Sequence, residues 1–213
     1  MTVISQMLEQ RVREHATLCL EHYRAHWGRE FASKAVGNDV RELSVIGCYS
    51  KATGVLRCAT VGLSMPAFMN DWVGYELFFA CRTGHPNSSY ESNSEGLLSL
   101  AIHIEKHGGI RRNATLKLVH GIWPELEIDS MIITEPVGEV EQACSFRNSL
   151  LSFELCWCLP LFESEVDYIG GHGISCFFAE MEKNGICELD LGRKRMLDSG
   201  GRGVMLDSQN ERG

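Results

Sequence analysis

The 213-residue sequence lacks the features that would place it in several large classes of protein. No apolar run reaches the roughly 18 residues that a membrane-spanning helix needs. The first six residues lack the basic start and apolar stretch of a secretory signal. Basic side chains are also scarce, with 20 Lys and Arg against 28 Asp and Glu, for a formal charge of −8. We therefore expect a cytoplasmic protein that binds neither membrane nor nucleic acid, with a surface suited to a basic protein partner.

The sequence also lacks a Cys-x-x-Cys motif, although it contains nine cysteines. An odd number of scattered cysteines without a secretory signal is typical of reduced thiols in the cytoplasm. The closest pair, Cys156 and Cys158, lies in an apolar run that is typical of a strand. There the two thiols would point to the same face of a sheet, without the bend that a zinc knuckle or a redox turn requires. We predict that the cysteines fill the core.

Motifs of catalysis and cofactor binding are missing as well. No serine lies in a Gly-x-Ser-x-Gly elbow, and neither the phosphate-loop nor the dinucleotide glycine pattern occurs. The sequence therefore assigns no catalytic residue and implies no cofactor.

Histidines give the one metal hypothesis. His22 and His26 lie one helical turn apart and form a weak candidate pair for zinc, if a third ligand comes from elsewhere. His15 shares their helix face but lies roughly 10 Å along the axis from His22, too far to share one ion with it. The alternative is that these rings fill core or edge positions, each with a hydrogen-bond partner.

Hydrophobic periodicity predicts three helical regions and several strands. An amphipathic helix is expected over residues 5–27, with Gly28 as its stop. A second helix should begin at Ser92 or Ser94 and end at Gly108, and a third region follows Pro160 and ends at residues 184–185. Extended segments are predicted at residues 43–49, 55–61, 75–81, 115–119, 128–134 and 150–159, the first two joined as a hairpin.

This order of elements predicts the fold class. We expect an α+β (mixed α/β) fold in a single domain over residues 1–198, with a mixed sheet flanked by helices. From residue 199 onward the composition shifts to glycine and charge, so residues 199–213 are predicted to form a flexible C-terminal tail.

The acidic run Glu163, Glu165 and Asp167 follows Pro160. These carboxylates could form a cation site, or they could occupy the first turn of a helix, where the helix dipole favours negative charge. We favour the second interpretation.

Four spaced motifs follow one another along the chain: Thr60-Val61-Gly62-Leu63-Ser64-Met65-Pro66, Tyr75-Glu76-Leu77, Leu159-Pro160-Leu161-Phe162-Glu163-Ser164-Glu165 and Asp190-Leu191-Gly192-Arg193. In this order they resemble the suppressor-of-fused domain family, in its bacterial single-domain form. The resemblance spans roughly residues 21–193, and its motif positions are Thr60, Gly62, Ser64, Glu76, Pro160, Asp190 and Arg193.

The same segments allow local predictions. Glu76 should face away from Tyr75 and Leu77 on its strand, and Pro160 should end a strand. The family usually has threonine where this chain has Phe162, so the helix cap should shift to Ser164 with Asp167 as its partner.

The resemblance implies a non-enzymatic protein-binding module, most plausibly an immunity-type protein that neutralises a partner toxin by direct contact. Two alternatives stay open: a metal- or thiol-dependent enzyme that uses His22 and His26 or a cysteine, and a regulatory scaffold with a non-toxin partner. The sequence does not predict the oligomeric state. An aromatic and acidic binding patch is expected to draw on Asp71, Trp72, His85, Glu163, Glu165 and Tyr168.

Overall fold

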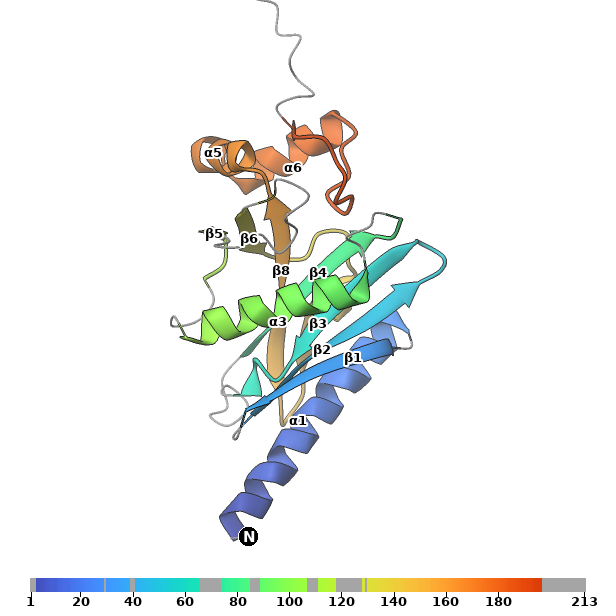
Figure 1. Ribbon diagram of the computed structural model, residues 1–213, viewed down its shortest axis with the longest axis vertical. Helices are drawn as coiled ribbons and strands as arrows, with labels where there is room; N and C mark the ends of the chain where they lie inside the picture. Colours follow the sequence, from blue (N-terminus) through green and yellow to red (C-terminus); the bar gives the residue numbers. More distant parts are fainter. Residues whose placement is uncertain are drawn as a thin grey trace, which may run out of the picture.

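A mixed β-sheet runs through the centre of the computed structural model (Figure 1). The structure describes residues 3–28, 30–38, 41–65, 74–84, 89–106, 111–117, 128 and 130–196. The strand order is β1-β2-β3-β4-β8-β6-β5, and β7 pairs with β8. The strands are β1 (Glu30–Asn38), β2 (Arg41–Ser50), β3 (Val55–Val61), β4 (Gly74–Arg82), β5 (Ala114–Lys117), β6 (Ser130–Thr134), β7 (Ser145–Arg147) and β8 (Ser152–Leu161). Neighbouring strands are antiparallel except β4 and β8, which are parallel, so the predicted α+β class is confirmed.

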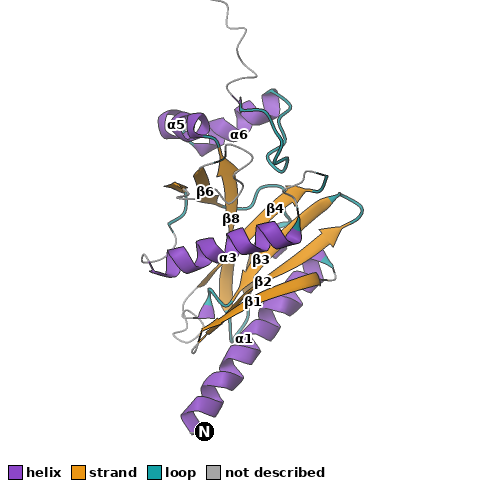
Figure 2. Cartoon of the chain, viewed as in Figure 1, coloured by secondary structure: helices purple, strands orange, loops and turns teal. Residues whose placement is uncertain are grey.

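Helices cover both faces of this sheet (Figure 2). Helix α1 (Val3–Trp27) packs on one face, α3 (Tyr90–Lys106) packs on the other, and α4 (Glu141–Cys144) contacts α1. Helices α5 (Glu163–His172) and α6 (Ile174–Lys183) follow the end of β8 (Figure 1). None of the described helices is long and apolar enough to cross a membrane.

Strand β8 shows how the two cores are separated. Phe153, Leu155 and Trp157 belong to the hydrophobic cluster beneath α1 and α6. Cys156 and Cys158 belong to the cluster beneath α3. Because successive side chains of a strand point to opposite faces, a strand buried on both sides reads as a continuous apolar run. The two cysteines share a face as predicted.

Most predicted elements are present with bounds close to those expected. The first helix ends at Trp27, and Gly28 follows in a left-handed conformation with φ of +91°. The hairpin of β2 and β3 turns at Gly54, whose φ is +65°. Glycine is favoured at both positions because a Cβ would be strained there.

The structure differs from the sequence-based expectations in three details. Helix α3 begins at Tyr90, so Ser92 and Ser94 lie inside it, and the Ser89 hydroxyl accepts the Ser92 N–H at 3.1 Å. Strand β1 was missed because its sequence has no clear alternation of apolar and polar residues. The third helical region is two helices, which break at Gly173, where φ is +84°. The predicted tail, residues 199–213, lies outside the described residues.

Strands β4 and β8 separate part of the way along their length (Figure 1). Their ladder runs from Gly74 and Phe153 to Phe78 and Trp157. Beyond that point, among the described strands, β4 pairs only with β3 and β8 pairs only with β6. The far ends of β4 and β8 therefore do not pair with each other.

Candidate functional site

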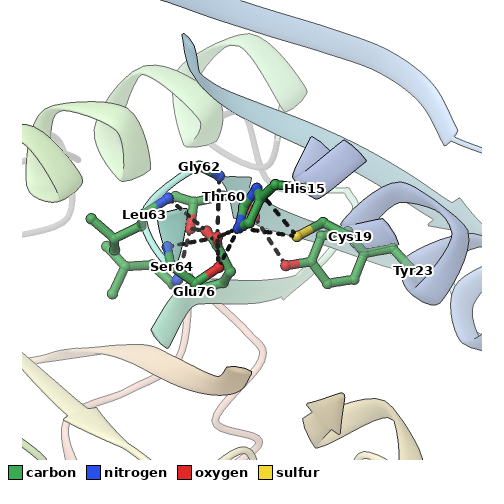
Figure 3. A network of polar contacts seen from close by, with 9 residues as sticks. His15, Cys19, Tyr23, Thr60, Gly62, Leu63, Ser64 and Glu76 are labelled. Atoms are coloured by element: carbon green, nitrogen blue, oxygen red, sulfur yellow. Dashed lines mark hydrogen bonds and ion pairs between the residues drawn. The ribbon is translucent and has the colours of Figure 1, made fainter. Parts of the chain in front are cut away.

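A buried carboxylate, Glu76, is the centre of the first polar network (Figure 3). Its Oε1 accepts the backbone N–H groups of Gly62 at 3.1 Å and Ser64 at 2.9 Å, and the Ser64 hydroxyl at 2.6 Å. Its Oε2 accepts the Thr60 hydroxyl at 2.5 Å and the Leu63 N–H at 3.3 Å. A buried charge without such donors would be costly, so this loop is what allows Glu76 to lie in the core.

Local sequence explains why the loop can surround the carboxylate. Tyr75 and Leu77 contribute to the α3 side of the sheet, and Glu76 faces away from them as predicted. The structure adds that Glu76 faces α1 (Figure 3). Gly62 has φ of +117°, a conformation favourable only to glycine, and it turns the chain as it leaves β3. Successive N–H groups then point at one anion, as in a backbone nest.

Helix α1 reaches this network through three side chains. His15 Nε2 lies 2.7 Å from Ser64 Oγ, and the Tyr23 hydroxyl donates to the Thr60 carbonyl at 2.9 Å. Cys19 Sγ lies 3.9 Å from His15 Nε2. The Ser64 hydroxyl donates its one hydrogen bond to Glu76, so its oxygen accepts a hydrogen bond from His15. His15 Nε2 is therefore assigned as the protonated nitrogen. The network therefore ties α1 to β3 and β4.

Burial perturbs the titration of these groups. Desolvation lowers the pKa of His15, although the negative charge of Glu76 acts in the opposite direction. Desolvation, reinforced by Glu76, raises the pKa of Cys19 well above its ordinary value. At neutral pH, His15 is therefore a neutral imidazole and Cys19 a thiol, which is a poor nucleophile.

The order of contacts differs from that of a hydrolytic triad. In a triad the histidine lies between the serine and the acid and accepts the serine proton. Here Ser64 lies between His15 and Glu76, and its hydroxyl donates a hydrogen bond to the carboxylate. His15 Nε2 and Glu76 Oε1 are 3.9 Å apart. All three residues are at most 1% exposed. The geometry favours a structural role.

His15, Cys19 and Glu76 also form the one group in the described chain whose ligand atoms could converge on a metal ion, all within 4.8 Å of one another. Glu76 Oε1, however, already accepts three hydrogen bonds, which leaves little capacity for an ion. The contacts present favour the hydrogen-bonded arrangement.

The predicted zinc pair is arranged differently. His22 lies against the edge of His26, with ring centroids 4.8 Å apart, and His22 Nε2 donates to the Ala143 carbonyl at 3.0 Å. No third ligand joins them within the described part of the chain. Burial lowers the pKa of His22, as expected for a ring packed against Phe146 and Phe153. The structure thus gives His22 a packing role and does not support the metal hypothesis for this pair.

A second buried carboxylate, Glu165, is the centre of the other network. Arg193 donates from Nη1 to Oε1 at 3.0 Å and from Nη2 to Oε2 at 2.8 Å, a bidentate pair. Glu165 also accepts the N–H of Phe162 at 3.1 Å and that of Met196 at 3.3 Å. The Arg193 guanidinium lies 4.8 Å above the Phe162 ring. This network fastens the start of α5 to the segment after α6.

That segment, residues 186–196, is called the strap. Its Leu189 carbonyl accepts the N–H of Arg82 at the end of β4, at 2.7 Å. Arg193 Nη2 donates to the Pro160 carbonyl near the end of β8, at 2.9 Å. Asp190 shapes the turn between them, because its side chain accepts the Gly192 N–H at 2.9 Å. The strap therefore connects the two strand ends that do not pair with each other.

Of the predicted partner-binding residues, three lie outside the described part of the chain, two are exposed or half-buried, and one is fully buried. Asp71, Trp72 and His85 lie outside the described residues. Glu163 is exposed and forms an ion pair with Lys117 at 3.6 Å.

Tyr168, half-buried, stacks on His172 with ring centroids 4.3 Å apart. Glu165 has no exposed surface, so its carboxylate does not lie on an open patch. Its position at the third residue of α5 turns it back toward the end of β8 and the strap.

The predicted helix cap also needs correction. Helix α5 begins at Glu163 after Phe162, which has no side-chain acceptor, and Glu165 accepts the Phe162 N–H. A capping box has two hydrogen bonds, and only the one from the Phe162 N–H to the Glu165 side chain is formed here. The other would need the side-chain oxygen of the threonine that the family usually has. The Ser164 hydroxyl is buried without a described partner, so it does not act as the cap.

The family-motif positions divide between the two networks. Thr60, Gly62, Ser64 and Glu76 form the first, and Pro160, Asp190 and Arg193 belong to the second. Sequence reasoning missed His15 and Cys19 as partners of the first network. Their four-residue spacing on the apolar stripe of α1 was the available signal, but nothing in the sequence linked His15 to Ser64, which lies 49 positions away.

The fold and these networks define an α+β domain whose motif residues are structural supports for two buried carboxylates. Solved structures share this fold. A suppressor-of-fused (SUFU) homolog from Neisseria gonorrhoeae matches with a TM-score of 0.62 at 15% identity, over 86% of this chain and 97% of that chain.

A chain of the Sufu–Fu complex matches with a TM-score of 0.62 at 9% identity, over 97% of this chain and 98% of that one. Drosophila Suppressor of Fused matches with a TM-score of 0.54 at 9% identity, over 74% and 43% of the two chains. No family model and no curated protein matches. The chain therefore has a suppressor-of-fused-like fold.

Proposed function

We propose that this protein is a non-enzymatic protein-binding module of the suppressor-of-fused type, and that it acts in the cytoplasm as an immunity-type protein that neutralises a basic toxin domain. The observation that carries the proposal is the concentration of negative charge around α5 and α6. The shared fold supports it, because one of the similar chains comes from a complex.

The charge is unevenly distributed along the chain. Residues 163–190 contain seven Asp and Glu and one Lys, so this stretch has a net charge of −6 out of −8 for the whole chain. Glu165 is paired with Arg193, which lies outside the stretch. The other six carboxylates are on exposed or half-buried residues: Glu163, Asp167, Glu180, Glu182, Glu188 and Asp190. A surface of one sign accelerates encounter with a partner of the opposite sign.

An aromatic anchor lies within this surface. Tyr168 is half-buried and stacks on the exposed ring of His172, which leaves part of a rigid aromatic pair open to contact. Binding energy in interfaces concentrates on such aromatic residues, while surrounding charges mainly set the association rate. Asp71, Trp72 and His85 remain proposed contributors.

The buried networks argue for binding rather than catalysis. The Ser64 hydroxyl donates its hydrogen bond to Glu76, and burial raises the pKa of the Cys19 thiol, so neither side chain is activated as a nucleophile. A thiol enzyme needs an accessible cysteine of lowered pKa. The metal- or thiol-dependent alternative has no such support in these groups.

Co-expression with the product of the adjacent reading frame tests the proposal. We expect a stable complex and rescue of growth if that product is toxic. The double charge reversal Glu163→Lys and Asp167→Lys should weaken binding at least tenfold, with a reduced dependence on salt. The matched control is Glu14→Lys with Glu21→Lys on exposed positions of α1, which should leave affinity within about twofold.

The possible results separate the alternatives. A complex without rescue would favour a scaffold with a non-toxin partner. Absence of any complex, or equal losses in both charge-reversal variants, would contradict the proposed interface.

A further inference from the structure

We propose that the strap is an internal stand-in for a partner segment, and that its seat is a binding site for an extended peptide that carries an arginine. The seat consists of the end of β4, the end of β8 and the carboxylate of Glu165. This inference rests on the proposed function, since it identifies the kind of segment that a protein partner would insert.

The seat offers one donor and two acceptors to whatever occupies it. The Arg82 N–H donates to a carbonyl, which the strap supplies from Leu189. The Pro160 carbonyl and the Glu165 carboxylate both accept from one guanidinium, which the strap supplies from Arg193. The carbonyl and the guanidinium come from residues four positions apart in one segment. That spacing defines the motif that a competing peptide must match.

Apolar contacts complete the seat. Leu191 is 3% exposed and packs in the cluster beneath α3, while Met196 is 1% exposed and packs in the cluster beneath α1 and α6. The occupant therefore needs an apolar side chain two positions before its arginine. It also needs one three positions after it.

The strap is built so that a competitor could replace it. It forms no strand of the sheet, and its residues Asp190, Gly192 and Lys194 are exposed. A segment of this kind opens at a lower cost than the strands it contacts. Once it opens, Glu165 is a buried carboxylate without its cation, so the seat selects a replacement that carries positive charge.

The geometry selects arginine over lysine. The pair with Glu165 is bidentate, the same guanidinium reaches Pro160, and its central carbon lies over the Phe162 ring. A planar fork of donors makes all of these contacts, whereas an ammonium group would make one or two. The acidic residues around α5 and α6 would attract such a segment, and they match the basic partner proposed above.

A labelled peptide tests the seat without any natural partner. Fluorescein-labelled peptide of residues 188–196 is titrated against the full chain and against the Leu191→Ala variant, whose strap is weakened while Glu165 is unchanged. We expect the variant to bind the peptide at least tenfold more tightly than the parent chain. The same peptide with Arg193→Ala should lose at least tenfold in affinity, and Arg193→Lys should fall between them.

Hydrogen exchange shows whether the strap has opened. In Leu191→Ala, amides of the strap and of Arg82 should exchange faster, while β3 stays protected. If the strap opens and the peptide does not bind, the proposal is overturned; if the strap stays as protected as in the parent chain in both Leu191→Ala and Met196→Ala, it is not displaceable and the proposal also fails. Absence of a toxin partner would contradict the proposed function and leave this result unchanged.

Discussion

Arg193 holds both carboxylate oxygens of Glu165, at 3.0 and 2.8 Å, with neither side chain more than 4% exposed. Removing one member of a buried ion pair leaves the other charge uncompensated, which typically costs about 3–5 kcal/mol. We expect Arg193→Ala to lower the free energy of unfolding by about that amount, as measured by urea denaturation. The exposed neighbour provides the control: Lys194→Ala should change stability by less than about 0.5 kcal/mol. Equal effects of the two substitutions would refute a special role for the pair.

Glu76 allows a sharper test, because its donors surround both oxygens. Glu76→Gln keeps the shape but turns an amide N–H₂ toward other donors in either orientation. An unsatisfied buried polar group costs about 1–3 kcal/mol, so we expect a loss of at least about 2 kcal/mol in urea denaturation. Glu163→Gln on the exposed side of α5 is the matched control, with an expected change below about 0.5 kcal/mol. A neutral Glu76→Gln would contradict the network.

Two buried histidines predict how stability depends on pH. Burial lowers the pKa of His15 and of His22 below the ordinary value of 6.5. The unfolded chain therefore binds more protons than the folded chain as the pH falls through this range. The contribution of the two neutral rings to the free energy of unfolding is fully present above about pH 6.5, and it is lost as the pH falls below that value.

Urea denaturation between pH 7.5 and 5.5 measures this effect. His15→Gln with His22→Gln keeps an N–H donor near each former Nε2 and should flatten the pH dependence. His172→Gln, at an exposed position, should leave it unchanged. A parent chain whose stability is constant over this range would contradict the burial of both rings.

Cysteine reactivity follows burial. Cys176 is exposed, whereas Cys19, Cys48, Cys58, Cys81, Cys156 and Cys158 are buried. Desolvation raises the pKa of Cys81 and of Cys156 to about 12. Because the thiolate is the reactive form, we expect iodoacetamide at pH 7.5 to label Cys176 first and the six buried thiols only after unfolding. Intact-mass analysis counts the labels, and Cys176→Ser should remove the fast one. Fast labelling of a buried thiol in the folded chain would contradict this order.

Hydrophobic periodicity and glycine positions in the sequence predicted the features that arise from neighbouring residues. The stripe of α1, the turn at Gly54 and the alternation of Glu76 with Tyr75 and Leu77 all arise from positions close in sequence. The motif order also led to the suppressor-of-fused-like fold. Strand β1 escaped prediction because its backbone pairs with β2 without a matching apolar pattern.

The sites could be predicted only in part. Glu163 and Glu165 looked equivalent as acidic residues after Pro160, yet one is exposed and the other fully buried. The difference depends on the residue at which α5 begins, and no cap in the sequence specified that residue. His22 drew attention for its spacing to His26, but its partner is a backbone carbonyl of α4.

The sequence by itself determined the charge balance, the cysteine content, the main helices and strands, and the residues that lie in the family motifs. Only the tertiary structure decided what those residues do. His15 meets Ser64 across 49 positions, and Glu165 meets Arg193 across 28, because the sheet brings distant segments together around two carboxylates. Such contacts depend on the residue at which a helix begins and on how strands diverge, and local periodicity predicts neither.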